Sequence, residues 1–242
     1  MYPTPNTNLL TLTLLLTTSL ASPLIEKRAP PISMGLARTF GALAASTLTS
    51  VGNTVVTGDC GTYPGTSITG FPPGPGVCTG ITTSGGTASM NAEASCLLAY
   101  NNAKGLVPTR ALTSANLGGL VLPPGIYTFP TQAAALSAGS TLTLSGAGNP
   151  NGQWVFQIGT TFAAGANSRI VMSNGGQACN VYFVLGTAAS IGANASLQGN
   201  ILAGMTIAAS AGASGSGTWC SKNAAVTLIN NKLAALSTCT SV

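Results

Sequence analysis

Charged side chains are scarce in this chain of 242 residues. Lys, Arg, Asp and Glu together make up 5% of it, against about 25% in an ordinary soluble domain. Aromatic residues also reach only 5%, and histidine is absent. Gly, Ala, Ser and Thr dominate instead, while Val, Ile and Leu recur along the sequence. Since a disordered chain would lack those branched apolar residues, the composition predicts a packed fold, and the length fits one domain.

The shortage of acids and the absence of histidine exclude most kinds of enzyme. After residue 28 the acidic side chains are Asp59 and Glu93 alone. Hydrolysis of a glycosidic bond needs a carboxylate pair, and a calcium-dependent lyase needs several carboxylates. No Ser-His-Asp arrangement is possible without histidine. The sequence also has no Gly-rich phosphate-binding loop with a lysine. We expect Asp59 to have a structural role in a turn and Glu93 to lie in the first turn of a helix, so the protein is expected to be no enzyme and to use no cofactor.

The basic residues are too dispersed for a nucleic-acid surface, which needs clustered contacts to phosphates. Beyond the N-terminus the chain also has no uninterrupted apolar run of about 18 residues, so no membrane span is predicted. We expect a monomer that binds neither nucleic acid nor membrane. The basic residues after residue 28 are Arg38, Lys104, Arg110, Arg169, Lys222 and Lys232.

The N-terminus has the pattern of a secretory targeting segment. Residues 9–20 form a short apolar core, and Ser19-Leu20-Ala21 offers a small-x-small cleavage site. Glu26-Lys27-Arg28 then provides a dibasic processing site. The sequence therefore predicts a signal peptide at 1–21, a propeptide at 22–28 and a secreted, extracellular domain at 29–242.

Six cysteines follow the predicted processing site, an even number that favours disulfides in a secreted chain. Fifteen pairings are possible in principle. A metal site is disfavoured because the chain has no C-x-x-C motif and no histidine. One glycosylation sequon is present at Asn194-Ala195-Ser196. The cysteines are Cys60, Cys78, Cys96, Cys179, Cys220 and Cys239.

Secondary structure is predicted to be short strands between small-residue turns, with one exception. Residues 88–104 are Ala-rich and carry a small-residue stripe typical of an α-helix, for which Ser89 would cap the start and Gly105 the end. The strands are four to six residues long and punctuated by Gly, Asn and Ser. The helix stripe is Ala92, Cys96, Ala99 and Ala103, and the clearest strands are Leu142–Leu144, Trp154–Ile158, Ile170–Met172, Val181–Leu185 and Ala225–Ile229.

The strands belong to an imperfect repeat, which predicts a β-solenoid whose coils stack about 4.8 Å apart. Each copy has one branched or aromatic residue that should point inward, so that its small neighbours point outward. Stacking would align those small residues as a ladder on one flat face. The copies are T-T-F-A-A-G-A-N-S from Thr160, A-S-I-G-A-N-A-S from Ala189, M-T-I-A-A-S-A-G-A-S from Met205 and A-V-T-L from Ala225, with Phe162, Ile191, Ile207 and Val226 inward.

Two interpretations of such a face remain open from the residues alone. Regularly spaced hydroxyls and methyls on a rigid sheet suit a ligand that is itself a lattice of ordered water. Alternatively, small outward residues serve only the close stacking of coils. A different function, a surface solenoid that contacts carbohydrate or protein, would need exposed aromatic platforms; Trp154 is expected in the core, which leaves Trp219 and Tyr63.

Five ordered blocks resemble the ice-binding (antifreeze) protein family of fungi and bacteria, of the DUF3494 type. The resemblance implies a mainly β fold, a right-handed irregular β-helix of triangular cross-section with one long flanking α-helix. It also implies a secreted protein that binds ice through one flat β-face and slows ice growth and recrystallisation. The blocks are M-G-L-A-R-T-F-G-A-L-A-A-S-T-L-T-S-V-G at 34–52, T-V-V-T-G-D-C-G-T-Y-P-G-T-S-I-T-G-F-P-P-G at 54–74, L-G-G-L-V-L-P-P-G-I-Y-T-F at 117–129, Q-W-V-F-Q-I-G-T-T-F at 153–162 and Q-A-C-N-V-Y-F-V-L-G-T-A-A-S-I-G at 177–192.

The resemblance places the ice-binding residues on successive coils. The family's short T-A-x-[T/N] motif is approximated in this chain by Thr187-Ala188-Ala189-Ser190, with Ser in the final position. A glycan on Asn194 would lie close to the face. The implied residues are Thr161, Ala163, Ala188, Ser190, Thr206, Ala208, Ala225 and Thr227, with Ser46 and Thr82 as additions.

Overall fold

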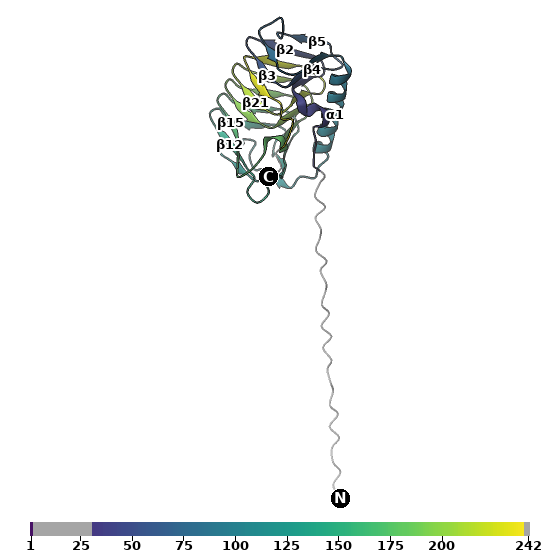
Figure 1. Ribbon diagram of the computed structural model, residues 1–242. Helices are drawn as coiled ribbons and strands as arrows, with labels where there is room; N and C mark the ends of the chain where they lie inside the picture. Colours follow the sequence, from purple (N-terminus) through teal and green to yellow (C-terminus); the bar gives the residue numbers. More distant parts are fainter. Residues whose placement is uncertain (2–30, 240–242) are drawn as a thin grey trace. The chain divides into compact units, whose positions relative to one another are not determined.

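Most coils of the chain contribute three short strands, one to each of three parallel sheets (Figure 1). The computed structural model describes Met1 and residues 31–239, so the predicted signal peptide and propeptide lie outside the described residues. All strand pairs among the described residues are parallel, as expected when each strand stacks on its counterpart one coil away. The predicted β-solenoid with one flanking helix is confirmed.

The solenoid has three sheets, A, B and C, in which strands far apart in the sequence lie side by side. In spatial order, sheet A contains β7 (Thr82–Ser84), β4 (Asp59–Thr62), β1 (Phe40–Ala44), β22 (Trp219–Ser221), β19 (Asn200–Ala203), β16 (Val181–Leu185), β13 (Trp154–Ile158), β10 (Gly125–Thr128) and β8 (Arg110–Ala111). Sheet B contains β11 (Ala134–Leu136), β14 (Phe162–Ala164), β17 (Ala189–Ile191), β20 (Ile207–Ala209), β23 (Val226–Ile229), β2 (Thr47–Val51) and β5 (Ser67–Thr69). Sheet C contains β6 (Val77–Cys78), β3 (Val55–Thr57), β24 (Lys232–Ala234), β21 (Ser214–Ser216), β18 (Ser196–Gln198), β15 (Arg169–Ser173), β12 (Thr141–Ser145) and β9 (Val121–Leu122). Two 3-10 turns, η1 (Gly35–Thr39) and η2 (Ala178–Asn180), complete the coils.

The order of coils in space differs from their order in the chain. The N-terminal coils, β1–β3 and β4–β6, form one end of the solenoid. Helix α1 (Thr87–Lys104) then runs along the coils, and the remaining strands stack back toward the N-terminal end (Figure 1). The last coil, β22–β24, pairs with β1–β3, so the first and last coils of the chain are neighbours inside the stack.

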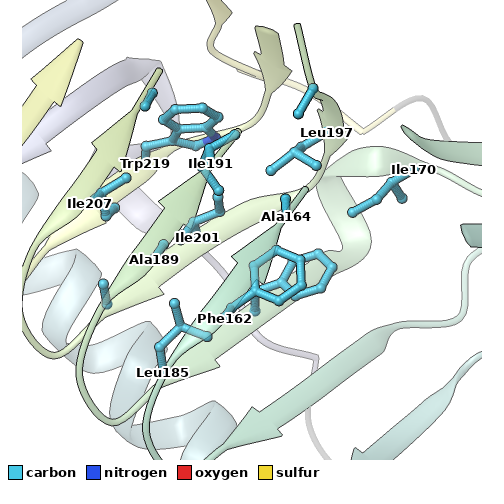
Figure 2. Close-up of a cluster of buried hydrophobic side chains, with 14 of the residues drawn as sticks. Phe162, Ala164, Ile170, Leu185, Ala189, Ile191, Leu197, Ile201, Ile207 and Trp219 are labelled. Carbon is cyan, nitrogen blue, oxygen red and sulfur yellow. The ribbon is translucent and has the colours of Figure 1, made fainter. Parts of the chain in front are cut away.

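The interior between the sheets is filled by the inward side chain of every strand. Phe156, Phe162 and Phe183 stack across successive coils, with centroids 4.7 Å apart for Phe156–Phe183 and 4.9 Å for Phe162–Phe183. Trp154 is fully buried, as predicted. Trp219 is also fully buried and contributes to the same core (Figure 2), so it is no aromatic platform on the surface.

Helix α1 covers sheet A through the predicted small-residue stripe, whose four members are completely buried. Small side chains let the helix approach the sheet closely, and Gln157 donates its amide to the carbonyls of Ala103, Lys104 and Leu106 at the helix end. The N-cap is Gly86 rather than Ser89, which lies inside the first turn and donates to the Gly86 carbonyl. The expectation for Glu93 is wrong: because the helix begins at Thr87, Glu93 falls in its second turn and is buried against the sheet.

The corner between sheets B and C is formed by a column of residues with positive φ, a conformation open to Gly and tolerated by Asn. Asn167, Asn194 and Asn230 have φ of 56°, 56° and 50°, and Gly212 has 74°. The backbone ladder continues through them, from the Asn167 amide to the Ala193 carbonyl and from the Asn194 amide to the Ala211 carbonyl. Asn194 is exposed and lies at this corner.

All six cysteines are paired, which confirms the disulfide prediction and selects one of the open pairings. The bonds are Cys60–Cys78, Cys96–Cys220 and Cys179–Cys239. They close sequence separations of 18, 124 and 60 residues respectively. The second bond joins α1 to β22, and thus fixes the helix to the last coil.

Removing the bond between α1 and β22 should cost more stability than removing the N-terminal one. In the loop-entropy description, the cost rises with the length of chain that the bond closes. We expect the double variant Cys96→Ala/Cys220→Ala to lose about 2–4 kcal/mol. Cys60→Ala/Cys78→Ala, its matched control, should lose about 1.7 kcal/mol less. Denaturant unfolding followed by circular dichroism measures both, and an equal or reversed order would contradict the prediction.

Candidate binding face on sheet B

The three sheets present very different outer surfaces. Sheet A is covered by α1 along its length. The outer side of sheet C carries the charged residues Arg169 and Lys232, together with Gln198. The strands of sheet B contain no charged residue at all. Sheet B is therefore the open surface that combines small side chains with an absence of charge.

Strand register arranges the outward residues of sheet B in two columns, which together are called the sheet-B face. The second column follows the register partners from one strand to the next: Ala135, Ala163, Ser190, Ala208, Thr227, Thr49 and Thr69. The first column lies two residues earlier on each coil, and its carbonyls accept the ladder hydrogen bonds from the Phe162, Ala189 and Ile207 amides. Its members are Thr161, Ala188, Thr206, Ala225, Thr47 and Ser67.

Eight of the ten predicted site residues lie together on this face, four in each column. Ser46 is exposed but precedes β2, so the face positions of its coil are Thr47 and Thr49 instead. Thr82 is separated from the face, because it pairs with Cys60 at the edge of sheet A. The eight grouped residues are Thr161, Ala163, Ala188, Ser190, Thr206, Ala208, Ala225 and Thr227.

The repeat alignment is wrong at one coil. It matches Ile191 to Phe162, but the structure pairs Phe162 with Ala189, and Ile191 with Ala164. All four side chains still point inward, because a shift of two residues preserves the alternation of a strand. The outward pair of this coil is consequently Ala188 and Ser190, with Gly192 displaced toward the B–C corner.

Sequence reasoning missed the hydroxyl-rich end of the face. Thr47, Thr49, Ser67 and Thr69 extend both columns across β2 and β5. The Thr69 and Thr49 hydroxyls lie 3.4 Å apart, within hydrogen-bond distance. The short T-L-T and S-I-T patterns carry a signal of alternation, but nothing local indicates that these N-terminal strands continue a sheet begun by residues 134–229.

The face also has an apolar margin beside its hydroxyl-rich end. Val51 and Ile229 are register partners two residues beyond Thr49 and Thr227. Their side chains are 59% and 40% exposed, although both are branched and apolar. At this corner, the threonines of the sheet-B face are therefore bordered by exposed apolar side chains, and no charged residue lies among them.

The other candidate residues have structural surroundings. Asp59 accepts a hydrogen bond from the Ile81 amide at 2.9 Å, consistent with the structural role predicted for it. Glu93 lies beside Cys96 and Cys220, the one metal-ligand-like cluster among the described residues, but both sulfurs there are joined in a disulfide. Tyr63 is partly buried. Among residues 31–239, no helix is long and apolar enough to cross a membrane.

These features define a class of protein: a disulfide-bonded β-solenoid that offers one flat, uncharged face of threonine, serine and alanine to a repeating surface. The chain belongs to the ice-binding-like family, whose sequence profile matches residues 42–234.

Individual relatives agree with that assignment. An ice-binding protein of Nostoc sp. (strain HG1) is 40% identical over 210 residues, covering 86% of this chain and 76% of the relative. Ice-binding protein K1-A of Typhula ishikariensis is 30% identical over 200 residues, covering 71% and 76%. The crystal structure of an ice-binding protein from the Antarctic ascomycete Antarctomyces psychrotrophicus superposes with a TM-score of 0.80 at 36% identity, covering 86% of this chain and 100% of that one.

Proposed function

We propose that this protein binds ice through the sheet-B face. The observation that carries the proposal is the pair of register-aligned columns of Thr, Ser and Ala, uninterrupted by any charge across seven strands. Membership of the ice-binding-like family and the names of the relatives support the same function. Adsorbed molecules would force the ice front to curve between them and so slow growth and recrystallisation, without any catalysis.

The physical basis is a match between a rigid array and a lattice. Strands about 4.8 Å apart repeat each hydroxyl and methyl at a fixed spacing. Hydroxyls hold waters by hydrogen bonding, and the methyls of Thr and Ala confine the water between them. Short side chains lose little conformational entropy on docking. A rigid face therefore adds many weak contacts without an ordering cost for each.

The direct experiment uses the chain from Ala29 onward, expressed with its disulfides. We expect faceted ice crystals, a thermal-hysteresis gap and inhibition of recrystallisation. Round crystals that grow and coarsen as in buffer would contradict ice binding.

We further propose that the protein is secreted as a monomer after cleavage at residues 21 and 28. The short apolar segment at 9–20 and the dibasic Lys27-Arg28 support this, as do three disulfides, which persist in oxidising compartments. N-terminal sequencing of the protein from culture medium should begin at Ala29. A secreted chain that begins at Met1 would contradict the processing.

Asn194 is expected to carry an N-linked glycan when the protein is made in a eukaryotic secretory pathway. The side chain is exposed at the B–C corner, and its sequon continues through Ser196. Peptide mass spectrometry should find the glycan on Asn194, and Asn194→Asp should remove the mass. Asn167 occupies the same corner one coil away with the same φ but has no sequon, so it is the matched control. Unmodified Asn194 in the secreted protein would contradict the prediction.

A further inference from the structure

A pocket lies at the corner between sheets A and B, beside the C-terminal end of α1. Its volume is about 300 Å³, at the lower end of the usual range for small-molecule sites. It is formed by the helix, by the ends of β10, β13 and β16, and by the turn that follows β10. Its walls include Tyr100, Lys104, Thr128, Phe129, Thr131 and Gln132. None of these residues belongs to the sheet-B face.

Two ammonium groups lie near the Tyr100 ring; Lys104 lines the pocket, whereas Lys222 lies outside its lining. The Lys222 Nζ lies 3.6 Å from the centroid of the Tyr100 ring, and the Lys104 Nζ lies 5.8 Å from it. The ring is held in place because the Tyr100 hydroxyl donates to the Leu185 carbonyl at 3.2 Å. Burial, and secondarily the positive charge of Lys104, lower the pKa of Lys222. The two cations therefore repel each other beside a fixed aromatic ring.

No acidic side chain of the described residues offsets these cations. Asp59 bonds the Ile81 amide in a different coil. Glu93 faces the Cys220 sulfur at 3.7 Å, and burial raises its pKa to about 8, so it is mainly uncharged at neutral pH. Like charges held together without a partner favour an anion between or beside them.

The rest of the wall is suited to a sugar ring. Phe129 and Tyr100 supply aromatic surface, and Thr128, Thr131 and Gln132 supply hydroxyl and amide groups. The Gln157 side-chain amide donates hydrogen bonds to the three carbonyl oxygens at the helix end. Without that donor, the partial negative charge of these oxygens would repel an anion in the pocket. Aromatic surface, hydrogen-bonding groups and two cations together match an acidic sugar better than a bare ion.

We propose that this pocket binds one hexuronate unit, the carboxylate-bearing ring of acidic polysaccharides. The carboxylate would pair with Lys104, while Lys222 adds positive charge from beside the Tyr100 ring, and the sugar ring would lie against Phe129 and hydrogen-bond to Thr131 and Gln132. Since the pocket is separate from the sheet-B face, a bound polysaccharide would leave that face open. The protein would then be held near a uronate-rich matrix and could meet ice at the same time.

The test is an NMR titration of the ¹⁵N-labelled disulfide-bonded protein with sodium glucuronate at constant ionic strength. We expect saturable shifts at Phe129, Thr131 and Gln132. Lys104→Gln, at an exposed helix position, should weaken binding about tenfold. Lys222→Gln removes a charge outside the pocket lining and should weaken binding by a smaller factor. Lys232→Gln, which removes a cation from sheet C, is the matched control and should leave affinity unchanged.

Glucose has the sugar ring without the carboxylate, and acetate has the carboxylate without the ring. Each should bind at least about tenfold more weakly than glucuronate. An oligouronate that shifts the same residues with equal or higher affinity would identify a polysaccharide as the source. An oligouronate that fails where glucuronate binds would identify a free sugar acid. Absence of saturable shifts in the pocket, glucuronate affinity unchanged in Lys104→Gln, or acetate binding as tight as glucuronate would each overturn the proposal. None of these outcomes depends on ice activity.

Discussion

Thr206→Tyr and Ser190→Tyr are each expected to abolish thermal hysteresis and recrystallisation inhibition. The two residues lie on neighbouring coils, Thr206 in the first column of the sheet-B face and Ser190 in the second. A phenol ring there would stand above the plane of the surrounding methyls and hydroxyls, so that only one side chain could touch a flat ice surface. Both positions point outward, so the core and the circular dichroism spectrum should be unchanged.

The control for these variants is Thr57→Tyr, an exposed threonine in β3 of sheet C. It adds the same ring to the same solenoid and should retain full activity. Thr49→Tyr tests the hydroxyl-rich end and should reduce activity as strongly as Thr206→Tyr if the face extends over β2. Full activity in Thr206→Tyr and Ser190→Tyr, or loss in Thr57→Tyr, would place ice binding on another surface.

Glu93→Gln is expected to remove most of the dependence of stability on pH. The Glu93 side chain is 9% exposed, and its Oε1 has no hydrogen-bond partner among the described residues. Burial raises the pKa of this carboxyl from 4.5 to about 8. Between those two values the folded protein keeps a proton that the unfolded chain has lost.

Neutral Glu93 stabilises the fold at low pH. This stabilisation is fully present below pH 4.5 and is lost as the pH rises through about 8. The free energy of unfolding should fall by about 1.4 kcal/mol per pH unit in this window, or roughly 4 kcal/mol between about pH 5 and pH 8. Gln keeps the shape without the charge, so urea unfolding of Glu93→Gln across that range should give a nearly level profile. Wild-type stability as level as that of Glu93→Gln would contradict a buried, protonated carboxyl.

Local patterns are sufficient to predict most secondary structure. The helix is expected at 88–104 and lies at Thr87–Lys104, because its stripe of small residues recurs at helical spacing. Strand Val181–Leu185 matches its predicted bounds, and Phe162, Ile191 and Ile207 point inward as alternation requires. Each of these features depends on neighbours within a few residues.

The failures concern contacts between segments that are distant in sequence. Thr82 is assigned to the face as an addition implied by the family resemblance, yet its strand pairs at the edge of sheet A. Glu93 is assigned to the helix start, whereas the proximity of β22 buries it beside Cys220. The repeat aligns Ile191 with Phe162, whereas the structure pairs Ile191 with Ala164, two residues later. Alternation alone cannot distinguish registers that differ by two residues.

The sequence by itself determined the chemical character of the protein: a packed β-solenoid of small residues with too few acids for hydrolysis and an uncharged repeat. Only the tertiary structure decided which residues form one surface. The columns reach Thr47, Thr49, Ser67 and Thr69 because the last coil pairs with the first. Cys96 lies next to Cys220 because α1 packs along the coils of sheet A, which include β22. Parallel strands pair through backbone groups that every residue carries, so the partner of a strand depends on the path of the whole chain.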